Sequence, residues 1–485
     1  MKRRLTPAVF ALAGLLTLSA GASVGDTLNL DLPDIGSGAG GVLSPAEEQQ
    51  LGEAFMREIR QQLTILDDPE INEYIQSLGL KLVSNSDGQT QDFTFFIVVD
   101  PAINAFAAPG GFVGVNSGLI LATQSESELA SVLAHEIAHV TQHHLARAYE
   151  KADKFNLPTM AALVAAIVIG SRNSQLGQAA MAGVQAGSAQ AQINFTRSNE
   201  EEADRIGMQT LAHSDFDARS MPAFFERLEQ SARYAGPSLP EFLRTHPVTT
   251  SRIADTRNRS EQYPYRQVAD SLAYHLVRAK LRVLNETNPK QSVKRFAESL
   301  KSGQYRNAQA EHYGYALALL ANREYEAAGA EMRNLLAKDK DNLSYQLALA
   351  QIEMAAGHPG KAMPIYNEAL KLYPGNNPLT LLYSRALLQT GQAAKAKNLL
   401  EQHVRHRNPE PGLYKLLAEA EGAAGAKAAA HQALAEYYYL NGQTDEAIHQ
   451  LDLALQRKEA DFYQSSQIEA RLKQLQDEQA EAKKR

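Results

Sequence analysis

Small residues recur every 34 positions in the second half of this 485-residue chain. Two sets carry the period: Ala316, Ala350 and Ser384, and then Ala328, Ala362 and Ala396. A single helical hairpin cannot bury its apolar face alone, and small residues let neighbouring helices approach closely where hairpins stack. The spacing therefore predicts an all-α solenoid with a concave face.

A period of 34 residues is typical of tetratricopeptide repeats. We expect the repeat domain at residues 265–470 and a charged tail, solvated or frayed, at 471–485. The match at Ala435 follows Ser384 by 51 residues instead of 34, which predicts an additional helix near 413–421 that interrupts the array. Solenoid surfaces often bind peptides or proteins, so we expect partner docking, with a purely structural solenoid as the alternative.

The first half of the chain contains the sequence HEIAH at residues 135–139. Ser125 and Glu128 form a capping-box pattern, and neither Gly nor Pro interrupts residues 126–156, so a helix is predicted here. Imidazoles at i and i+4 lie on one helix face, about 5–6 Å apart at Cβ, a gap that one zinc ion can bridge. Glu136 could then reach a water molecule beside the ion. The pattern predicts a zinc peptidase, and a chance occurrence is the alternative.

A zinc site on His135 and His139 needs a further ligand from elsewhere in the chain. The chain has no cysteine, so distant carboxylates and histidines remain as candidates. His143 lies about 12 Å from His135 on a straight helix, too far to share one ion. We therefore expect His143 and His144 at the helix surface.

The strongest distant candidate is the acidic run NEEEAD at residues 199–204, which opens a second predicted helix. Glu200 and Asp204 share one face of that helix. One carboxylate could bind the metal while the other holds a ligand histidine in place. Alternatively, the run simply suits the positive end of the helix dipole.

The motifs HEIAH, EEEAD and Thr245-His246-Pro247, in this order, resemble the zinc metallopeptidases typified by the CaaX prenyl protease, and especially their soluble periplasmic β-barrel-assembly-enhancing members. The resemblance covers residues 45–260. It implies that Glu200 is the third zinc ligand and that Asp204 has a catalytic or supporting role. It also implies that Glu201 and Glu202 face solvent.

His246 has two interpretations. The resemblance implies a histidine that stabilises the transition state or occupies the water position and silences the enzyme. Pro247 restricts His246 to an extended conformation, which suits a side chain projected from a loop. A His-Pro turn at the start of a helix, without metal contact, is the alternative.

Residues 1–22 have the three parts of a signal peptide: a basic start, an apolar core at 8–18 and a small-residue cleavage signal at 20–22. We expect export to the periplasm, with an uncleaved membrane anchor as the alternative, although the apolar core is too short to span a bilayer. A linker is expected at 23–43. The net charge of −7 offers no basic surface for nucleic acid.

The peptidase domain is predicted at residues 44–262, beginning with a helix capped by Ser44 and Glu47. Residues 93–99 and 111–120 are predicted to be paired strands. The resemblance implies that an edge strand beside the metal receives substrate as an added strand; an ordinary hairpin is the alternative. Residues 157–194, rich in Ala, Gly, Ser and Gln, are expected to form a mobile, partly helical flap or a buried helical hairpin.

The sequence thus predicts a mainly α (α+β) protein: a mostly helical zinc metallopeptidase domain with a small β-sheet, then an all-α solenoid. One zinc ion per chain would be held by His135, His139 and Glu200, with Glu136 as the general base. The resemblance further implies degradation of misassembled outer-membrane β-barrel proteins and help in their assembly, with the repeats contacting the assembly machinery or the clients, and possible peripheral contact with the membrane. A chaperone or assembly adaptor whose peptidase centre is normally latent is the alternative.

Overall fold

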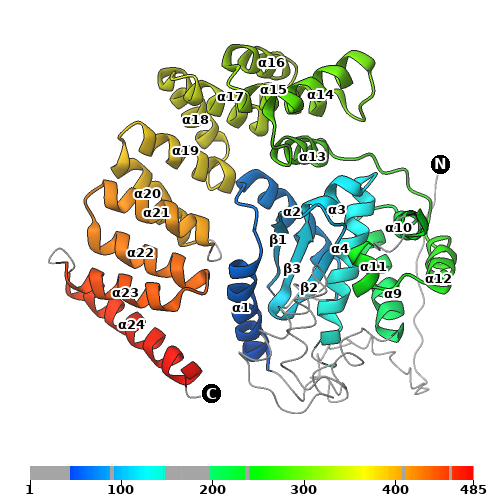
Figure 1. The fold of residues 1–485 in the computed structure, drawn as a ribbon, viewed down its shortest axis with the longest axis horizontal. Helices are drawn as coiled ribbons and strands as arrows, with labels where there is room; N and C mark the ends of the chain where they lie inside the picture. The colour runs from blue at the N-terminus through cyan, green and yellow to red at the C-terminus, as the bar shows by residue number, and fades with distance from the viewer. Residues whose placement is uncertain are drawn as a thin grey trace, which may run out of the picture.

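The computed structural model describes residues 44–87, 92–145, 147, 165, 197–234, 240–406, 410–457 and 461–483. It contains a mostly helical domain built on a three-stranded sheet, followed by an array of helices that curves around this domain (Figure 1). The predicted fold class is confirmed. The expected signal peptide, linker and flap lie outside the described residues, except for Ala165 of the flap.

The first domain consists of helices α1 (Pro45–Gln62), α2 (Pro69–Val83), α3 (Ser117–Ala122), α4 (Glu126–Thr141), α9 (Arg197–His213), α10 (Ser220–Tyr234), α11 (Glu241–Thr245) and α12 (Thr250–Ser260), with strands β1 (Thr94–Val98), β2 (Ala105–Ala108) and β3 (Phe112–Asn116). The capping box predicted at the start of α1 is present: Glu47 N–H donates to Ser44 Oγ, and Ser44 N–H donates to the Glu47 carboxylate at 2.7 Å.

The sheet has the strand order β1-β3-β2. The two predicted strands do pair, but they run parallel, with Thr94 opposite Phe112, so the hairpin alternative is wrong. The second strand ends at Asn116, because helix α3 begins at the next residue. The sequence analysis missed β2, which pairs antiparallel with β3 and forms a sheet edge packed against α4.

Helix α4 is shorter than predicted. It ends at Thr141 instead of continuing through residue 156, and the chain turns at His143, whose φ is 50°. A positive φ is uncommon for a residue other than Gly. No Gly or Pro marks this turn, so it could not be predicted from the local residues.

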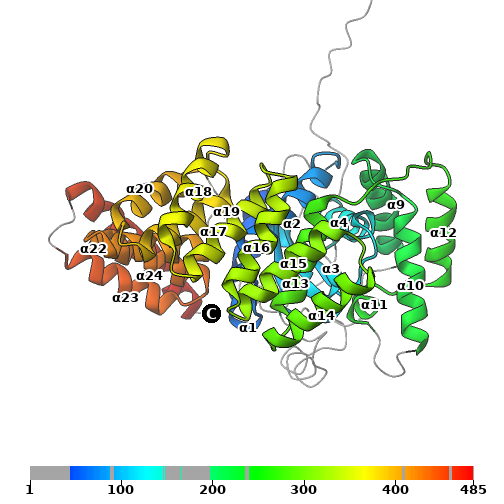
Figure 2. The ribbon, with the colours of Figure 1, turned by 90° about the horizontal axis from the view of Figure 1, so that it is seen from above.

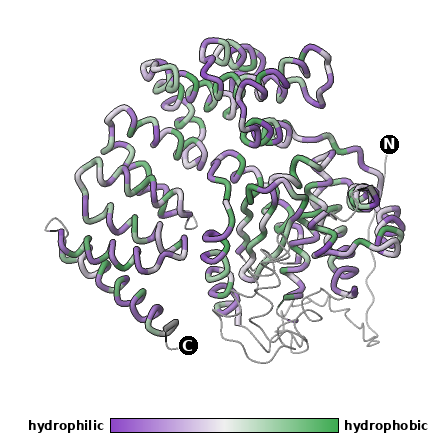
Figure 3. Tube along the Cα trace, viewed as in Figure 1, coloured by the Kyte–Doolittle hydropathy of each residue, from purple (hydrophilic) through white to green (hydrophobic). Residues whose placement is uncertain are grey.

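The array consists of α13 (Leu272–Leu284), α14 (Pro289–Ser302), α15 (Ala308–Ala321), α16 (Tyr325–Lys338), α17 (Leu343–Ala355), α18 (Pro359–Leu372), α19 (Asn377–Gln389), α20 (Ala393–Val404), α21 (Pro411–Ala423), α22 (Lys427–Leu440), α23 (Thr444–Leu455) and α24 (Phe462–Lys483). Apolar and polar residues alternate along these helices (Figure 3), as expected for amphipathic helices that stack. None of the described helices combines the length and the apolar composition that crossing a bilayer requires.

Two details of the array differ from the prediction. The additional helix expected near residues 413–421 is α21, but α21 and α22 begin 34 residues after α19 and α20, so they continue the array in register instead of interrupting it. The tail, expected from residue 471 as a solvated helix or a frayed end, is helical and forms the second half of α24, but this helix also packs on α23 and buries Leu475 completely.

The inner side of the array contacts the first domain, as both ribbon views show (Figures 1 and 2). Arg60 donates to the Leu440 carbonyl at 2.8 Å, which joins α1 to α22. Lys280 of α13 lies 2.7 Å from Asp68 at the start of α2. Helix α13 also contributes a side chain to the apolar core of the first domain, because Tyr274 belongs to that core. Part of the concave face is therefore covered by the protein's own first domain.

Candidate metal centre

Two helices form the centre, and a glycine lets them approach closely. A Cβ atom at Gly207 of α9 would lie 3.0 Å from the backbone of α4 at Ala134 and His135. One turn away, Ala138 and Ala203 pack together in a small apolar cluster. These small residues bring α9 against α4, so that its acidic face covers the HEIAH face.

The structure brings together His135, His139, Glu200 and His246, and one ligand atom from each lies within 4.8 Å of all the others. The Nε2 atoms of His135 and His139 are 3.0 Å apart. His246 Nδ1 lies 3.0 Å from Glu200 Oε1. All four side chains are buried. Two or three imidazoles with a carboxylate are a typical ligand set for zinc.

Glu136 lies next to this cluster on α4. Its side chain is 1% exposed, and neither carboxylate oxygen has a hydrogen-bond partner among the described residues. Its closest charged contact is His246, with Nε2 at 3.5 Å from Oε1. A buried carboxylate without hydrogen bonds is costly unless a cation lies nearby, so Glu136 fits a centre that holds a metal ion.

Asp204 and Arg252 form the support of this centre. Arg252, in α12, donates two hydrogen bonds to the Asp204 carboxylate at 2.7 and 2.8 Å and lies 2.7 Å from Glu200 Oε2. Asp204 Oδ1 in turn lies 3.0 Å from His135 Nδ1. Burial alone would lower the pKa of His135, but its contacts with Asp204 and Glu200 outweigh burial and raise that pKa to about 10. The surroundings of His135 therefore favour a positive charge, whether a proton or a metal ion supplies it.

His144 is not at the surface, contrary to expectation. It is fully buried, with Nδ1 at 2.8 Å from His139 Nδ1 and Nε2 at 3.1 Å from Glu202. Glu202 also accepts a hydrogen bond from Arg147 at 2.9 Å. Glu202 therefore does not simply face solvent, as the resemblance implied, whereas Glu201 is exposed.

His246 follows α11 directly. Its backbone N–H donates to the Phe242 carbonyl at 2.7 Å, and its ring stacks on the ring of Phe242 at a centroid distance of 4.9 Å. Its φ of −124° and ψ of 83° lie outside the helical region, as Pro247 requires, but ψ falls short of the extended conformation that was expected. These contacts point the imidazole into the centre, among the residues that could hold a metal ion.

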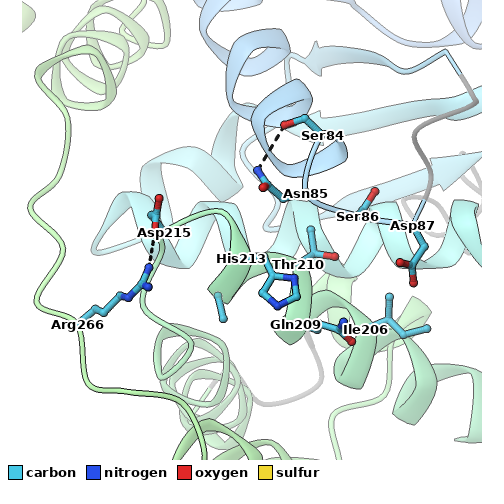
Figure 4. Close-up of a pocket in the computed structure, with 11 residues that line it drawn as sticks. Ser84, Asn85, Ser86, Asp87, Ile206, Gln209, Thr210, His213, Asp215 and Arg266 are labelled. Carbon is cyan, nitrogen blue, oxygen red and sulfur yellow. Dashed lines mark hydrogen bonds and ion pairs between the residues drawn. The ribbon is translucent and has the colours of Figure 1, made fainter. Parts of the chain in front are cut away.

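Two cavities lie near these helices. A small one of about 20 Å³ lies between β2 and the end of α4, where Ala107, Ala108 and His139 are among its lining residues. A larger polar one of about 570 Å³ lies at the C-terminal half of α9, lined among others by Asp87, His213 and the Asp215–Arg266 ion pair (Figure 4). None of the four clustered residues lines the larger cavity, which therefore belongs to a different surface.

Related proteins show which family this arrangement belongs to. The Beta-barrel assembly-enhancing protease of Escherichia coli (strain K12) is 36% identical over 444 residues, which cover 92% of this chain and 91% of that protein. This chain belongs to the beta-barrel assembly-enhancing protease family. The family protein of Yersinia pestis is 34% identical over 460 residues, 94% of each chain.

Two family models divide the chain in the same way as the structure. The model of peptidase family M48 matches residues 69–260, which contain the whole cluster, and a tetratricopeptide repeat model matches residues 353–420. The mitochondrial metalloendopeptidase OMA1 of Danio rerio is 29% identical over 209 residues, 41% of this chain and 43% of that protein. The first domain is thus that of a metallopeptidase, and the array is one of tetratricopeptide repeats.

Sequence reasoning missed two residues of this centre, Arg252 and His144. A signal existed for Arg252, because a buried carboxylate pair such as Glu200 and Asp204 requires a cation nearby. No such signal existed for His144, since its position depends on the unmarked turn at His143.

Proposed function

We propose that this protein is a zinc-dependent endopeptidase of the bacterial periplasm that acts on outer-membrane β-barrel proteins. The observation that carries the proposal is the buried cluster of His135, His139 and Glu200 beside the carboxylate of Glu136, which has no hydrogen-bond partner in the described part of the chain. In this proposal the three clustered residues hold one zinc ion per chain.

Zinc in such a site would supply a Lewis acid that polarises a peptide carbonyl and makes water more nucleophilic at neutral pH. Glu136 takes the proton from the attacking water and later returns it to the leaving amine. Its oxygens accept no hydrogen bond from the residues that the structure describes, and this supports the role because they remain available to a water molecule. Asp204 orients His135 through their contact at 3.0 Å, and Arg252 holds Asp204 in place through two hydrogen bonds.

His246 would be the fourth ligand in this proposal, and the enzyme would be latent while its imidazole occupies that position. Support comes from its place within the cluster and from its 3.5 Å distance to Glu136, in the region that a substrate carbonyl would enter. Activation would require His246 to withdraw.

The substrate would bind as an added strand along β2. In the described part of the chain, β3 takes one edge of β2 and no strand takes the other. A small cavity is lined both by residues of β2 and by His139, and this proximity of β2 to the centre supports the proposal. Recognition through backbone hydrogen bonds gives weak sequence preference and favours unfolded, extended segments, such as those of misassembled barrels.

The names of the relatives support a role in barrel assembly, which we extend to this chain: it would degrade stalled barrels and assist assembly through its repeats. The repeats would contact the assembly machinery or the clients. Export through residues 1–22 is part of the same proposal. A second candidate, a chaperone or adaptor with a latent peptidase centre, is favoured by the position of His246.

Glu136→Gln tests the proposed chemistry. Loss of a general base should reduce casein cleavage by about 10²–10⁴-fold, while stoichiometric zinc remains, because Glu136 is not a ligand. Glu201→Gln, a matched change at an exposed residue, should leave cleavage unchanged. Purified protein without stoichiometric metal would contradict the proposal. If Glu136→Gln supports barrel assembly in cells as well as the unaltered protein does, the adaptor function is the principal one.

His246→Ala tests latency. We expect faster casein cleavage at unchanged zinc content, because the remaining ligands still hold the ion and the position occupied by the imidazole becomes open. His213→Ala, in the separate polar cavity, is the matched control. Absence of any gain would remove the latency proposal, and a loss of activity would instead favour transition-state stabilisation by His246.

A further inference from the structure

The turn after α4 returns a second histidine to the motif helix. Helix α4 ends at Thr141. The positive φ of His143 then changes the direction of the chain, so that His144 lies against the last turn of α4. The His144 side chain is 0% exposed and lies between His139 and Glu202, with a hydrogen bond on each ring nitrogen. His144 is not among the metal ligands expected from the sequence motifs and the family resemblance.

The hydrogen bonds determine which nitrogens carry protons. The Glu202 carboxylate accepts a hydrogen bond from Arg147 and, as an ionised group, can only accept. His144 Nε2 must therefore carry the hydrogen that it shares with Glu202. His139 directs its Nε2 toward the centre, where a ligand histidine needs a free lone pair, so the proton of a neutral His139 lies on Nδ1, beside Nδ1 of His144. Nδ1 of His144 is then an acceptor, and its partner at 2.8 Å, Nδ1 of His139, must be the donor.

A histidine protonated at Nδ1 has its lone pair on Nε2. In His139 that atom lies 3.0 Å from His135 Nε2 and 3.5 Å from Glu200 Oε1, which is the direction of the centre. We propose that His144 and Glu202 are positioning residues that fix the tautomer and ring orientation of His139 for metal binding. The inference rests on the proposed function.

The two ligand histidines of α4 are then held by two separate supports. Asp204 and Arg252 hold His135, and His144 with Glu202 holds His139. Outer partners of this kind typically contribute about 10- to 100-fold to metal affinity. The contribution arises because a ligand held in one tautomer and one orientation does not have to be ordered when the ion binds.

The test is the zinc dissociation constant of the full chain, measured by competition with a chelator. His144→Phe keeps a ring of similar size but removes both hydrogen bonds, and we expect affinity about 10- to 100-fold weaker. His144→Asn, whose amide oxygen can still accept from His139, should recover part of the loss. His312→Phe is the matched control, because His312 also contacts a glutamate, Glu331 at 2.9 Å, but lies in the array.

A second variant and a second measurement keep the inference falsifiable. Glu202→Gln changes a half-buried residue and should not prevent folding; it should weaken zinc binding because an amide no longer imposes one tautomer on His144. The visible absorption bands of the cobalt-loaded protein should shift in both variants and not in His312→Phe. Unchanged affinity and unchanged bands in Glu202→Gln and His144→Phe would overturn the inference, whereas failure of the unaltered chain to bind zinc would overturn the proposed function instead.

Discussion

The two halves of the molecule bury different kinds of side chain. Beneath α4 and α9, four histidines, three carboxylates and Arg252 are each exposed by 3% or less. The repeat array buries mainly Ala, Leu and Tyr, with fully buried alanines at 34-residue intervals such as Ala316 and Ala350. Apolar burial stabilises a fold by itself, whereas buried charges cost free energy unless each has a partner. The apolar core of the array produces a periodic pattern in the sequence. The charged core of the first domain is visible in the sequence only through its HEIAH and EEEAD motifs.

Arg252→Leu should have the largest effect on stability. It leaves Asp204 and Glu200 buried without their guanidinium partner, which typically costs about 3–5 kcal/mol. The measurement is denaturant-induced unfolding of the metal-free protein. Arg259→Leu is the control, because Arg259 pairs with Asp255 on the exposed face of the same helix and such pairs contribute about 0.5 kcal/mol or less. Equal losses in both variants would remove the distinction between the two kinds of burial.

Glu421→Gln sharpens the comparison, because Glu421 is a buried acid inside the apolar array. Burial raises the pKa of Glu421 to about 7, whereas the unfolded value is about 4.3. The folded protein therefore keeps a proton that the unfolded chain loses as the pH rises from 4 to 7. The stability present below pH 4 declines over this window, by about 4 kcal/mol at most.

The variant has no such proton, so its stability relative to the unaltered protein should increase from pH 4 to pH 7 and then level off. Thermal unfolding followed at several pH values would show this trend. Glu419→Gln, on the exposed face of the same helix, should show none. A pH-independent difference for Glu421→Gln would mean that the acid is solvated in the folded protein.

Ala350→Leu should have the smallest of these effects, about 1–3 kcal/mol, because the larger side chain does not fit between tightly stacked helices. Ala355→Leu, at an exposed position of α17, is the control and should be nearly neutral. Unfolding monitored by circular dichroism would compare them. If both are neutral, the small residues of the repeat do not mark close packing.

The period of the small residues predicted the array and its helical hairpins, since one physical requirement repeats along the chain. It did not predict that α21 and α22 keep the register, because Ala418 and Ala430 stand among many other alanines. In the first domain, HEIAH predicted its own helix and face. The sequence could not show that β2 forms, because its four residues, AFAA, carry no alternating pattern.

The residues of the candidate centre that belong to sequence motifs could be predicted. Glu200, Asp204 and His246 came from the order of three motifs, and the structure does bring them to His135 and His139. Arg252 and His144 arrive through tertiary packing: Arg252 through the placement of α12, and His144 through a turn with a positive φ at a histidine. Neither feature has a local sequence signal.

Helix α13 has a consequence for the modularity of the protein. Asp270 accepts from the backbone N–H of Glu126 at the first turn of α4, Ser271 donates to the Glu126 carboxylate, and Tyr274 fills the core beneath. The repeat array therefore cannot be removed or exchanged without disturbing the first domain. A peptidase fragment that stops at residue 262 would expose an apolar hole at the base of the motif helix, so a shortened enzyme should retain the chain through Asn285.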